Sequence, residues 1–283
     1  MKSLIVTNNF NGKKLSSFVF YSFPNLAKNT FYKALRQKDI RINGKRINTD
    51  CTIYVDDKLS VYIADNLLFP SINLEIIYED DNILIVNKPN NIEVVGENSL
   101  TNLINKKFSS NNIMPCHRLD RNTTGLVLFA KNKEALDILF NKFKNHEIKK
   151  FYRALVYGIP KVKNARLEAF LFKDTKNSIV YISDTFKKGY QKIITSYKVL
   201  EEFPNNTSLL DVEIETGKTH QIRAHLAHIG YPIVGDGKYG INSVNKKLGY
   251  KYQQLCSYKL QFCFSSNSGI LSYLNNKIIE LKY

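Results

Sequence analysis

The amino-acid sequence predicts an α+β fold, with a mixed, mainly antiparallel sheet and a few flanking helices. Short apolar or alternating runs, which are typical of strands, outnumber the segments with helical periodicity. Several of these runs are joined by short polar turns, as in the hairpins of antiparallel sheets. A chain of 283 residues is long enough for one small and one large domain, which we expect at residues 1–68 and 72–283.

A basic helix and a hairpin are predicted in the first domain. A cap at Asn29 or Thr30 starts the helix. The apolar residues at helical spacing are Phe31, Ala34 and Leu35. Asn43 and Gly44 then separate two short strand-like runs, which is a strong hairpin signal. Pro70 marks the linker that ends this domain.

The second domain is predicted to contain more strands than helices. Residues 74–91 form a hairpin around a turn at residues 79–82, and residues 125–130 form a buried strand. A helix follows at residues 133–146, with an apolar stripe made of Leu136, Leu139, Phe140 and Phe143. Residues 161–205 are expected to mix polar loops with one strand. The remaining strands are predicted at residues 150–158, 192–200 and 208–215.

The charge balance points to a polyanionic partner. Lys and Arg total 41 and Asp and Glu total 25, which gives a formal net charge of +16. Nucleic acid is the first candidate for a protein with such an excess. A charge that serves only solubility is the alternative.

The cysteines and the apolar segments indicate the compartment. The four cysteines are scattered without a C-x-x-C pair, which is typical of reduced thiols. The amino terminus lacks a signal-peptide pattern, and no segment approaches the roughly 20 apolar residues of a membrane helix. We therefore expect a cytoplasmic protein without membrane contact.

An aspartate stands between two arginines at the start of the buried strand. Asp120 lies between Arg118 and Arg121, directly before the apolar run at residues 125–130. Side chains at such a position are held by a rigid scaffold and remain open to a ligand, which suits chemistry. A simple surface ion pair is the alternative.

A second polar cluster lies at residues 216–240. Thr219 is expected to cap a helix that buries Ile222, Leu226 and Ile229. His220 and Arg223 are three residues apart, so both side chains are expected to reach the same cleft. Arg223 is close to the apolar face and needs an anionic partner if it is buried, and Asp120 is the natural one.

Neither a metal site nor a nucleotide-phosphate loop is predicted in this cluster. Its three histidines, at residues 220, 225 and 228, spread around the helix, and no trio of acidic residues or cysteines completes a site. The stretch "GDGKYG" lacks the spacing of a phosphate loop. Its glycines are expected to allow sharp backbone turns near a ligand.

Four motifs in order resemble the RluA family of pseudouridine synthases. They are "NKPNN", "HRLDRNTTGLVLFAKN", "KKFYRALVYG" and "TGKTHQIRAHLAHIGYPIVGDGKYG". The resemblance implies a mainly antiparallel sheet split by a basic cleft, isomerisation of uridine in structured RNA, and no cofactor or metal. One departure is Asn91, where the family commonly has glycine.

The same resemblance implies roles for particular residues. It makes Asp120 the catalytic aspartate, Tyr152 the tyrosine that stacks on the base, and Arg223 the ion-pair partner of the aspartate. It makes Arg118 a residue that can enter the RNA stack. We also expect His220, beside the same cleft, to contact RNA.

The first domain resembles alpha-L, a small RNA-binding module that a small-subunit ribosomal protein shares with many RNA-modifying enzymes. The family often has Arg-Leu-Asp where this chain has "KKLSSF". This module goes with large-subunit ribosomal RNA more often than with transfer RNA, so the former is the expected target and the latter the alternative. We expect the protein to act as a monomer. The basic residues expected to face phosphates are Lys33, Arg36, Lys38, Arg41, Lys45 and Arg46.

The chemistry of pseudouridine formation agrees with this assignment. The bond between C1′ and N1 breaks and the ring rejoins the sugar through C5, without net oxidation or reduction. A carboxylate can attack the sugar, attack the ring, or assist deprotonation of the sugar, and the sequence leaves these routes open. An ionised aspartate in a water-poor pocket requires a fixed cation such as Arg223.

Two other functions are compatible with parts of the sequence. A ribosome-assembly factor with a silent site would need only the alpha-L module and the positive charge. A hydrolase would use Asp120 with His220, but a clear second carboxylate or a serine nucleophile is missing from the pattern.

Overall fold

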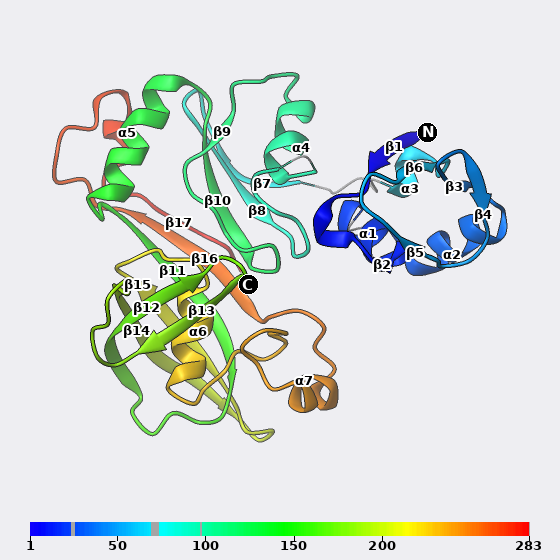
Figure 1. Ribbon diagram of the computed structural model, residues 1–283. Coiled ribbons are helices and arrows are strands. Elements are labelled where there is room, and N and C mark those ends of the chain that lie inside the picture. The colour runs from blue at the N-terminus through cyan, green and yellow to red at the C-terminus, as the bar shows by residue number, and fades with distance from the viewer. Residues whose placement is uncertain (24–25, 69–73, 97, 283) are drawn as a thin grey trace. The chain divides into compact units, whose positions relative to one another are not determined.

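The computed structural model describes residues 1–23, 26–68, 74–96 and 98–282. The chain divides into two compact units, Met1–Asn73 and Leu74–Tyr283 (Figure 1). The expected linker residue Pro70 lies outside the described residues.

The first unit contains a four-stranded antiparallel sheet and short helices (Figure 1). In sheet order its strands are β1 (Lys2–Ile5), β6 (Lys58–Val61), β3 (Ile40–Ile42) and β4 (Lys45–Ile47). The additional elements are the 3₁₀ helix η1 (Asn8–Phe10), the paired strands β2 (Lys13–Lys14) and β5 (Thr52–Ile53), and the helices α1 (Leu15–Ser22), α2 (Lys28–Arg36) and α3 (Asp65–Leu68).

The predicted hairpin of this unit is present, and the predicted helix starts earlier than expected. Asn43 and Gly44 have φ angles of 51° and 79°, as a tight turn between β3 and β4 requires. Helix α2 has Ala27 as its N-cap, so the predicted cap at Asn29 or Thr30 is wrong. The buried side chain before the helix, Leu26, sets the chain direction instead. The predicted apolar residues of α2 are buried.

Strand β1 and helix α1 are among the elements of the first unit that were not predicted. The α1 sequence "LSSFVFYS" is rich in serine, aromatic and β-branched residues, which have modest helix propensity. Its helix is stabilised by packing, because Leu15, Phe18 and Val19 are buried in the core of the unit. Tertiary contacts therefore decided this element.

The second unit is built on an eleven-stranded sheet. Among its described strand pairs only β10 and β16 run parallel, so the predicted mixed, mainly antiparallel α+β fold is confirmed. Along the sheet the strands are β13 (Ile179–Ser183), β12 (Asn164–Asp174), β14 (Gln191–Phe203), β15 (Thr207–Ile214), β11 (Ile148–Tyr157), β16 (Leu255–Phe262), β10 (Thr124–Ala130), β8 (Ile83–Lys88) and β7 (Glu75–Glu79). Two short strands extend it, β9 (Met114–Pro115) beside β10 and β17 (Ile278–Glu280) beside β16.

Helices pack on this sheet at two places. Helix α5 packs beside β10, and α6 packs on β13 and β14 (Figure 1). The core under α5 includes Leu136, Leu139 and Leu128, and Ala224 of α6 packs against Leu171. The helices of the unit are α4 (Leu100–Lys107), α5 (Lys133–Lys144), α6 (Gln221–His228), α7 (Asn242–Leu248) and the 3₁₀ helix η2 (Gly269–Leu274).

Some predictions for the second unit were wrong. The region at residues 161–205 contains more strand than expected: β14 confirms the strand predicted at residues 192–200, whereas β12 and β13 were not predicted. Strand β12 exposes several polar side chains, so its sequence resembles that of a loop. Phe140 is 48% exposed, and the buried face of α5 instead includes Ala135 and Lys142.

Gly125 permits the close approach of β10 and β16 at the start of the buried strand. Its φ angle is 106°, and an added Cβ would lie 2.2 Å from the backbone oxygen of Ser257. Any other residue would separate the two strands or distort them. Because Asp120 precedes this position by five residues, the packing also fixes where the Asp120 loop begins.

A buried ion pair fixes the start of β11, the strand that carries Tyr152. The Lys142 ammonium donates to Glu147 Oε2 at 2.7 Å and to the backbone oxygen of Ser266 at 2.7 Å. Glu147 also accepts hydrogen bonds from the backbone N–H of Ser265 at 2.8 Å and the Ser266 hydroxyl at 2.7 Å. The pair therefore joins α5, the beginning of β11 and the chain that leaves β16.

We expect Glu147→Gln to lower the free energy of unfolding by about 3 kcal/mol or more, because it leaves a buried ammonium without its counter-charge. The hydrogen bond from Lys142 lowers the pKa of Glu147 from 4.5 to about 2. The stabilisation is therefore complete above pH 4.5 and is lost as the pH falls towards 2. Denaturant unfolding at pH 7 and pH 3 would measure this.

A matched control is Asp137→Asn, which removes an exposed ion pair with Lys133. It should change the free energy of unfolding by less than about 1 kcal/mol. The difference between wild type and Glu147→Gln should be smaller at pH 3 than at pH 7. An equal difference at both pH values would contradict the assigned ion pair.

Candidate active site

A buried lysine shapes the loop that carries Asp120. The Lys88 side chain is fully buried, and its ammonium donates to the backbone oxygens of Pro89, Ile92 and Arg121 at 2.9 Å each. Burial lowers the pKa of Lys88 to about 7. These contacts tie the end of β8 to the loop before β10, so Lys88 positions Asp120 without contacting it.

Two further hydrogen bonds complete the support of this loop. Arg121 Nε donates to Asn91 Oδ1 at 3.2 Å, and Gln253 Nε2 donates to Thr123 Oγ1 at 2.6 Å. Asn91 has a φ angle of 61°, which explains why glycine is common there in the family and why asparagine is tolerated. The departure noted in the sequence therefore preserves the local backbone.

Arg223 lies between two carboxylates, those of Asp120 and Asp236. Its Nη1 donates to Asp120 Oδ2 at 2.8 Å, as the sequence predicted. Its Nε and Nη2 donate to Asp236 at 2.6 and 3.0 Å, so the two-donor edge of the guanidinium faces Asp236 and not Asp120. Asp236 is 1% exposed and Arg223 8% exposed. The sequence analysis missed Asp236.

The loop after α6 holds Asp236 ionised. Burial alone would raise its pKa, but the hydrogen bonds and charge of Arg223 lower it below the usual value. The backbone N–H groups of Lys238 and Tyr239 also donate to Asp236 Oδ1, at 2.8 and 3.1 Å. An aspartate inside the glycine-rich "GDGKYG" was the sequence signal that could have revealed this role.

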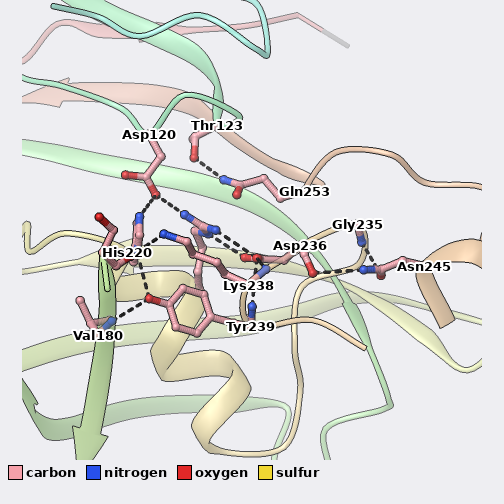
Figure 2. A network of polar contacts seen from close by, with 12 residues as sticks. Asp120, Thr123, Val180, His220, Gly235, Asp236, Lys238, Tyr239, Asn245 and Gln253 are labelled. Carbon is pink, nitrogen blue, oxygen red and sulfur yellow. Dashed lines mark hydrogen bonds and ion pairs between the residues drawn. The ribbon is translucent and has the colours of Figure 1, made fainter. Parts of the chain in front are cut away.

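The glycines of this loop allow the sharp turns that were predicted. An added Cβ at Gly235 would lie 2.0 Å from the backbone oxygen of Tyr252, and one at Gly240 would lie 2.3 Å from that of Asp236. Asn245 joins the turn, because its side chain accepts from the N–H of Gly235 and donates to the Asp236 oxygen (Figure 2). The loop is thus built around Asp236.

His220 is held as a neutral side chain beside Asp120. It is the N-cap of α6 with a φ angle of 54°, so the predicted cap Thr219 is wrong. Tyr239 accepts the N–H of Val180 at 2.9 Å, and its hydroxyl lies 2.8 Å from His220 Nδ1 (Figure 2). A hydroxyl can donate one hydrogen bond and accept two, so this contact fits either neutral tautomer of the ring.

Arg223 is therefore the cation that forms an ion pair with Asp120. Burial lowers the pKa of His220 to about 4, so the ring is neutral at neutral pH. Its Nε2 lies 3.9 Å from Asp120 Oδ2. Arg223 has to balance both carboxylates, and the Asp120 side chain, 23% exposed, is the one open to a ligand.

Tyr152 and Asp120 line one cavity. The inner cavity, as we call it, is lined by residues including Leu119, Asp120, Lys150, Tyr152, Ile214 and Ile222. Tyr152 is 5% exposed, and burial raises the pKa of its hydroxyl, which is therefore neutral. A flat ring and apolar walls beside a carboxylate suit a planar base attached to a sugar.

A second cavity adjoins the first. The outer cavity shares Arg118, Asp120, His220 and Arg223 with the inner one, so Asp120 lies on their border. Its additional basic residues are Arg121, Lys173 and Lys238. This concentration of positive side chains suits the phosphates of a polyanion.

The predicted site residues fall into two groups. Asp120, Tyr152, Arg223, His220 and Arg118 all line the cavities of the second unit. The other group lies in the first unit, where Lys33, Arg36, Lys38, Lys45 and Arg46 are exposed and Arg41 is half-buried over the ring of Tyr62.

The histidines of α6 form hydrogen bonds within the protein, and the described part of the chain offers no metal-binding cluster. It holds no group of three or more His, Cys, Asp or Glu side chains that could bind a metal ion. His225 Nδ1 lies 3.0 Å from Thr195 Oγ1, and His228 Nε2 lies 2.8 Å from Asp184 Oδ1.

No helix within the described ranges is long and apolar enough to cross a membrane.

Comparison with known proteins identifies the family. The family model for RNA pseudouridylate synthase matches residues 82–228. A protein of Mycoplasma capricolum subsp. capricolum named uncharacterized RNA pseudouridine synthase is 34% identical over 99% of this chain and 97% of its own length. The chain belongs to the RNA pseudouridylate synthase family. The resemblance to the RluA family is thereby confirmed, and the enzyme is an isomerase that acts on uridine in RNA.

Other relatives agree with this family. The ribosomal large subunit pseudouridine synthase C of Vibrio parahaemolyticus is 32% identical over 81% of this chain and 77% of its own. The structure of human RNA pseudouridylate synthase domain containing 1 matches 70% of this chain and 82% of its own, with a TM-score of 0.60 and 25% identity. The structure of human RNA pseudouridylate synthase domain containing 4 matches 74% of this chain and 88% of its own, with a TM-score of 0.59. Its identity to this chain is 22%, so it supports the fold alone.

We expect Arg223→Lys to lower turnover of this synthase by about 100-fold, although the charge is retained. An ammonium cannot present aligned donors to Asp120 and Asp236 at once. Asp236→Asn should cause a smaller loss of about 10-fold, because the guanidinium keeps its position but loses its buried counter-charge. Tritium release from RNA labelled at uridine C5 would measure both.

The control is Arg166→Lys, which alters an exposed arginine paired with Glu168 and Glu215. Its turnover should equal that of wild type. Turnover of Arg223→Lys within twofold of wild type would show that the shared guanidinium does not matter for the reaction.

Proposed function

We propose that Asp120 is the catalytic carboxylate with which this synthase converts uridine to pseudouridine in large-subunit ribosomal RNA. One observation carries the proposal. Asp120 is the carboxylate of the Arg223 pair that remains open to a ligand, and it shares the inner cavity with the ring of Tyr152. Asp236 is too deeply buried to play this role.

The reaction places clear demands on this carboxylate. The C1′–N1 bond breaks, a C1′–C5 bond forms, and the proton on C5 is lost while N1 gains one, so atoms and charge balance. Attack at C1′, attack at C6 and deprotonation of the sugar all require an ionised carboxylate within reach of the nucleoside. The ion pair with Arg223 provides the ionised form despite partial burial.

The neighbouring residues fit the steps that precede chemistry. A uridine inside folded RNA must leave its stack, which costs a few kcal/mol. Stacking of the base on Tyr152 would recover about 1–3 kcal/mol. Arg118 is exposed at the border of both cavities, where it can fill the vacated space, and the neutral His220 can hydrogen-bond to the RNA.

Ribosomal RNA is the target that the relatives favour. Several relatives that cover 81–87% of this chain carry the name ribosomal large subunit pseudouridine synthase C. The net charge of +16 and the exposed basic side chains of the first unit support binding to a large RNA. We infer that the first unit is an alpha-L RNA-binding module and that the enzyme acts as a cytoplasmic monomer. Transfer RNA is the alternative substrate.

The two other hypotheses, a ribosome-assembly factor and a hydrolase, receive less support. Membership of the synthase family and an intact ion pair at Asp120 argue against a silent assembly factor. The hydrolase hypothesis requires His220 to act with Asp120. His220 Nε2 and Asp120 Oδ2 are 3.9 Å apart, which is too far for a direct hydrogen bond.

We expect Asp120→Asn to abolish isomerisation, because an amide of the same size is neutral and a far poorer nucleophile. RNA binding should persist, since a negative charge is removed from a basic surface. Tritium release from C5-labelled large-subunit ribosomal RNA and transfer RNA transcripts, beside filter binding, would measure both properties. Turnover above a few per cent of wild type, in protein free of deamidated Asn, would defeat the assignment of Asp120.

We expect the double variant Lys33→Gln with Arg36→Gln to bind RNA more weakly and with a flatter salt dependence. Each lost phosphate contact removes about 0.7–0.9 from the slope of log affinity against log salt. Filter binding over a series of salt concentrations would measure the slope. The control, Lys133→Gln with Lys144→Gln on α5, changes the net charge equally. Equal slopes for the two variants would show that α2 does not contact phosphate.

A further inference from the structure

Lys150 is a cation in the inner cavity that has no described anionic partner. It lies on β11 two residues before Tyr152, and alternation along the strand places both side chains on the same face of the sheet. Among the described residues no carboxylate lies within ion-pair distance of its ammonium. Its neighbour Lys149, on the other face, pairs with Glu213 at 3.7 Å.

The cost of burying this cation is not offset by a counter-charge. Burial lowers the pKa of Lys150, which shows that the surroundings disfavour its charged form. The side chain passes the ring of Phe143, whose centroid lies 5.4 Å from Nζ. A partly buried ammonium that reaches a cavity without a partner is suited to an anionic or carbonyl ligand.

Gly217 provides the space for this ammonium. An added Cβ at Gly217 would lie 3.1 Å from Lys150 Nζ, which is closer than most such contacts. The backbone of Gly217 is not in the left-handed region, so local geometry does not require glycine. Because Gly217 has no side chain, Lys150 Nζ can occupy this position in the cavity.

The position of Lys150 favours the base over the phosphates as its ligand. Lys150 lines the inner cavity but not the outer one, where Arg121, Lys173 and Lys238 are gathered. Two residues along a strand span about 7 Å. If Tyr152 stacks on the uracil ring, a lysine at this distance on the same face reaches the edge of the ring.

We propose that Lys150 binds a carbonyl oxygen of the uracil and stabilises the negative charge that develops on the ring during catalysis. This inference rests on the proposed function, in which the uridine lies between Asp120 and Tyr152. When the C1′–N1 bond breaks, its electron pair stays on the ring and spreads over N1 and the carbonyl oxygens. The pair forms the new bond from C5 to C1′, after which C5 loses its proton, and Lys150 remains protonated throughout.

The same contact would serve the other route. Attack of a carboxylate at C6 also moves electrons onto a carbonyl oxygen of the ring, and these electrons return when the adduct breaks down. A fixed cation aimed at that oxygen stabilises the charged state more than the bound substrate. Lys150 would therefore raise the rate of the chemical step more than the affinity for RNA.

The test compares Lys150→Met, Gly217→Ala and the control Lys149→Met. Single-turnover rates are measured at saturating C5-tritiated large-subunit ribosomal RNA transcript, and affinity by filter binding. Lys150→Met should lower the rate by about 100-fold, as loss of one electrostatic donor does in other enzymes. Affinity and its salt slope should change little. Gly217→Ala should lower the rate by about 10-fold, because the methyl group displaces the ammonium while the charge remains.

The possible outcomes separate this inference from the proposed function. Wild-type protein without turnover on any RNA would contradict the proposed function itself. An active wild type with an unchanged rate for Lys150→Met would overturn the inference alone. So would a loss confined to affinity with a flatter salt slope, which would place Lys150 on a phosphate. If Lys150→Met fails to fold, Gly217→Ala is compared with Lys149→Met instead. A rate for Gly217→Ala equal to that of Lys149→Met would overturn the inference, and a rate about 10-fold lower would support it.

Discussion

The site depends on one guanidinium that holds two carboxylates. Arg223 uses its two-donor edge for the buried Asp236 and its remaining nitrogen for Asp120. A buried charge pair is costly unless its geometry and hydrogen bonds are complete, and here the backbone N–H groups of the following loop complete them. Asp236 fixes the orientation of Arg223, and Arg223 in turn fixes an ionised carboxylate at the border of two cavities.

The sheet brings this arrangement together from distant parts of the chain. Parallel pairing of β10 with β16 requires Gly125, and it sets the exit of the loop that carries Asp120. Strand β11 pairs with β16 on its other side and presents Tyr152. Helix α6 packs on β13 and β14 and presents Arg223. Packing density prevents small adjustments of these elements, so the distances in the site follow from the core.

The charged side chains of the site lie in different places, some around Asp120, some in the outer cavity and one in the inner cavity. His220 is kept neutral by burial, so it does not compete with Arg223 for Asp120. Arg121, Lys173 and Lys238 lie in the outer cavity, where a polyanion can approach. Lys150 stands apart in the inner cavity, beside the ring of Tyr152. This separation leaves an ionised carboxylate exposed beside a strongly positive surface.

The sequence by itself determined the family, the mixed, mainly antiparallel sheet and the pairing of Asp120 with Arg223, because motif order, hairpin turns and an arginine near an apolar face are local signals. Only the tertiary structure decided that Asp236 takes the two-donor edge of Arg223 and that Lys150 reaches the inner cavity unpaired. It also decided the helix α1, whose sequence has modest helix propensity, and the strand β12, which exposes polar side chains. Such features arise from contacts between segments far apart in the chain, which no local pattern encodes.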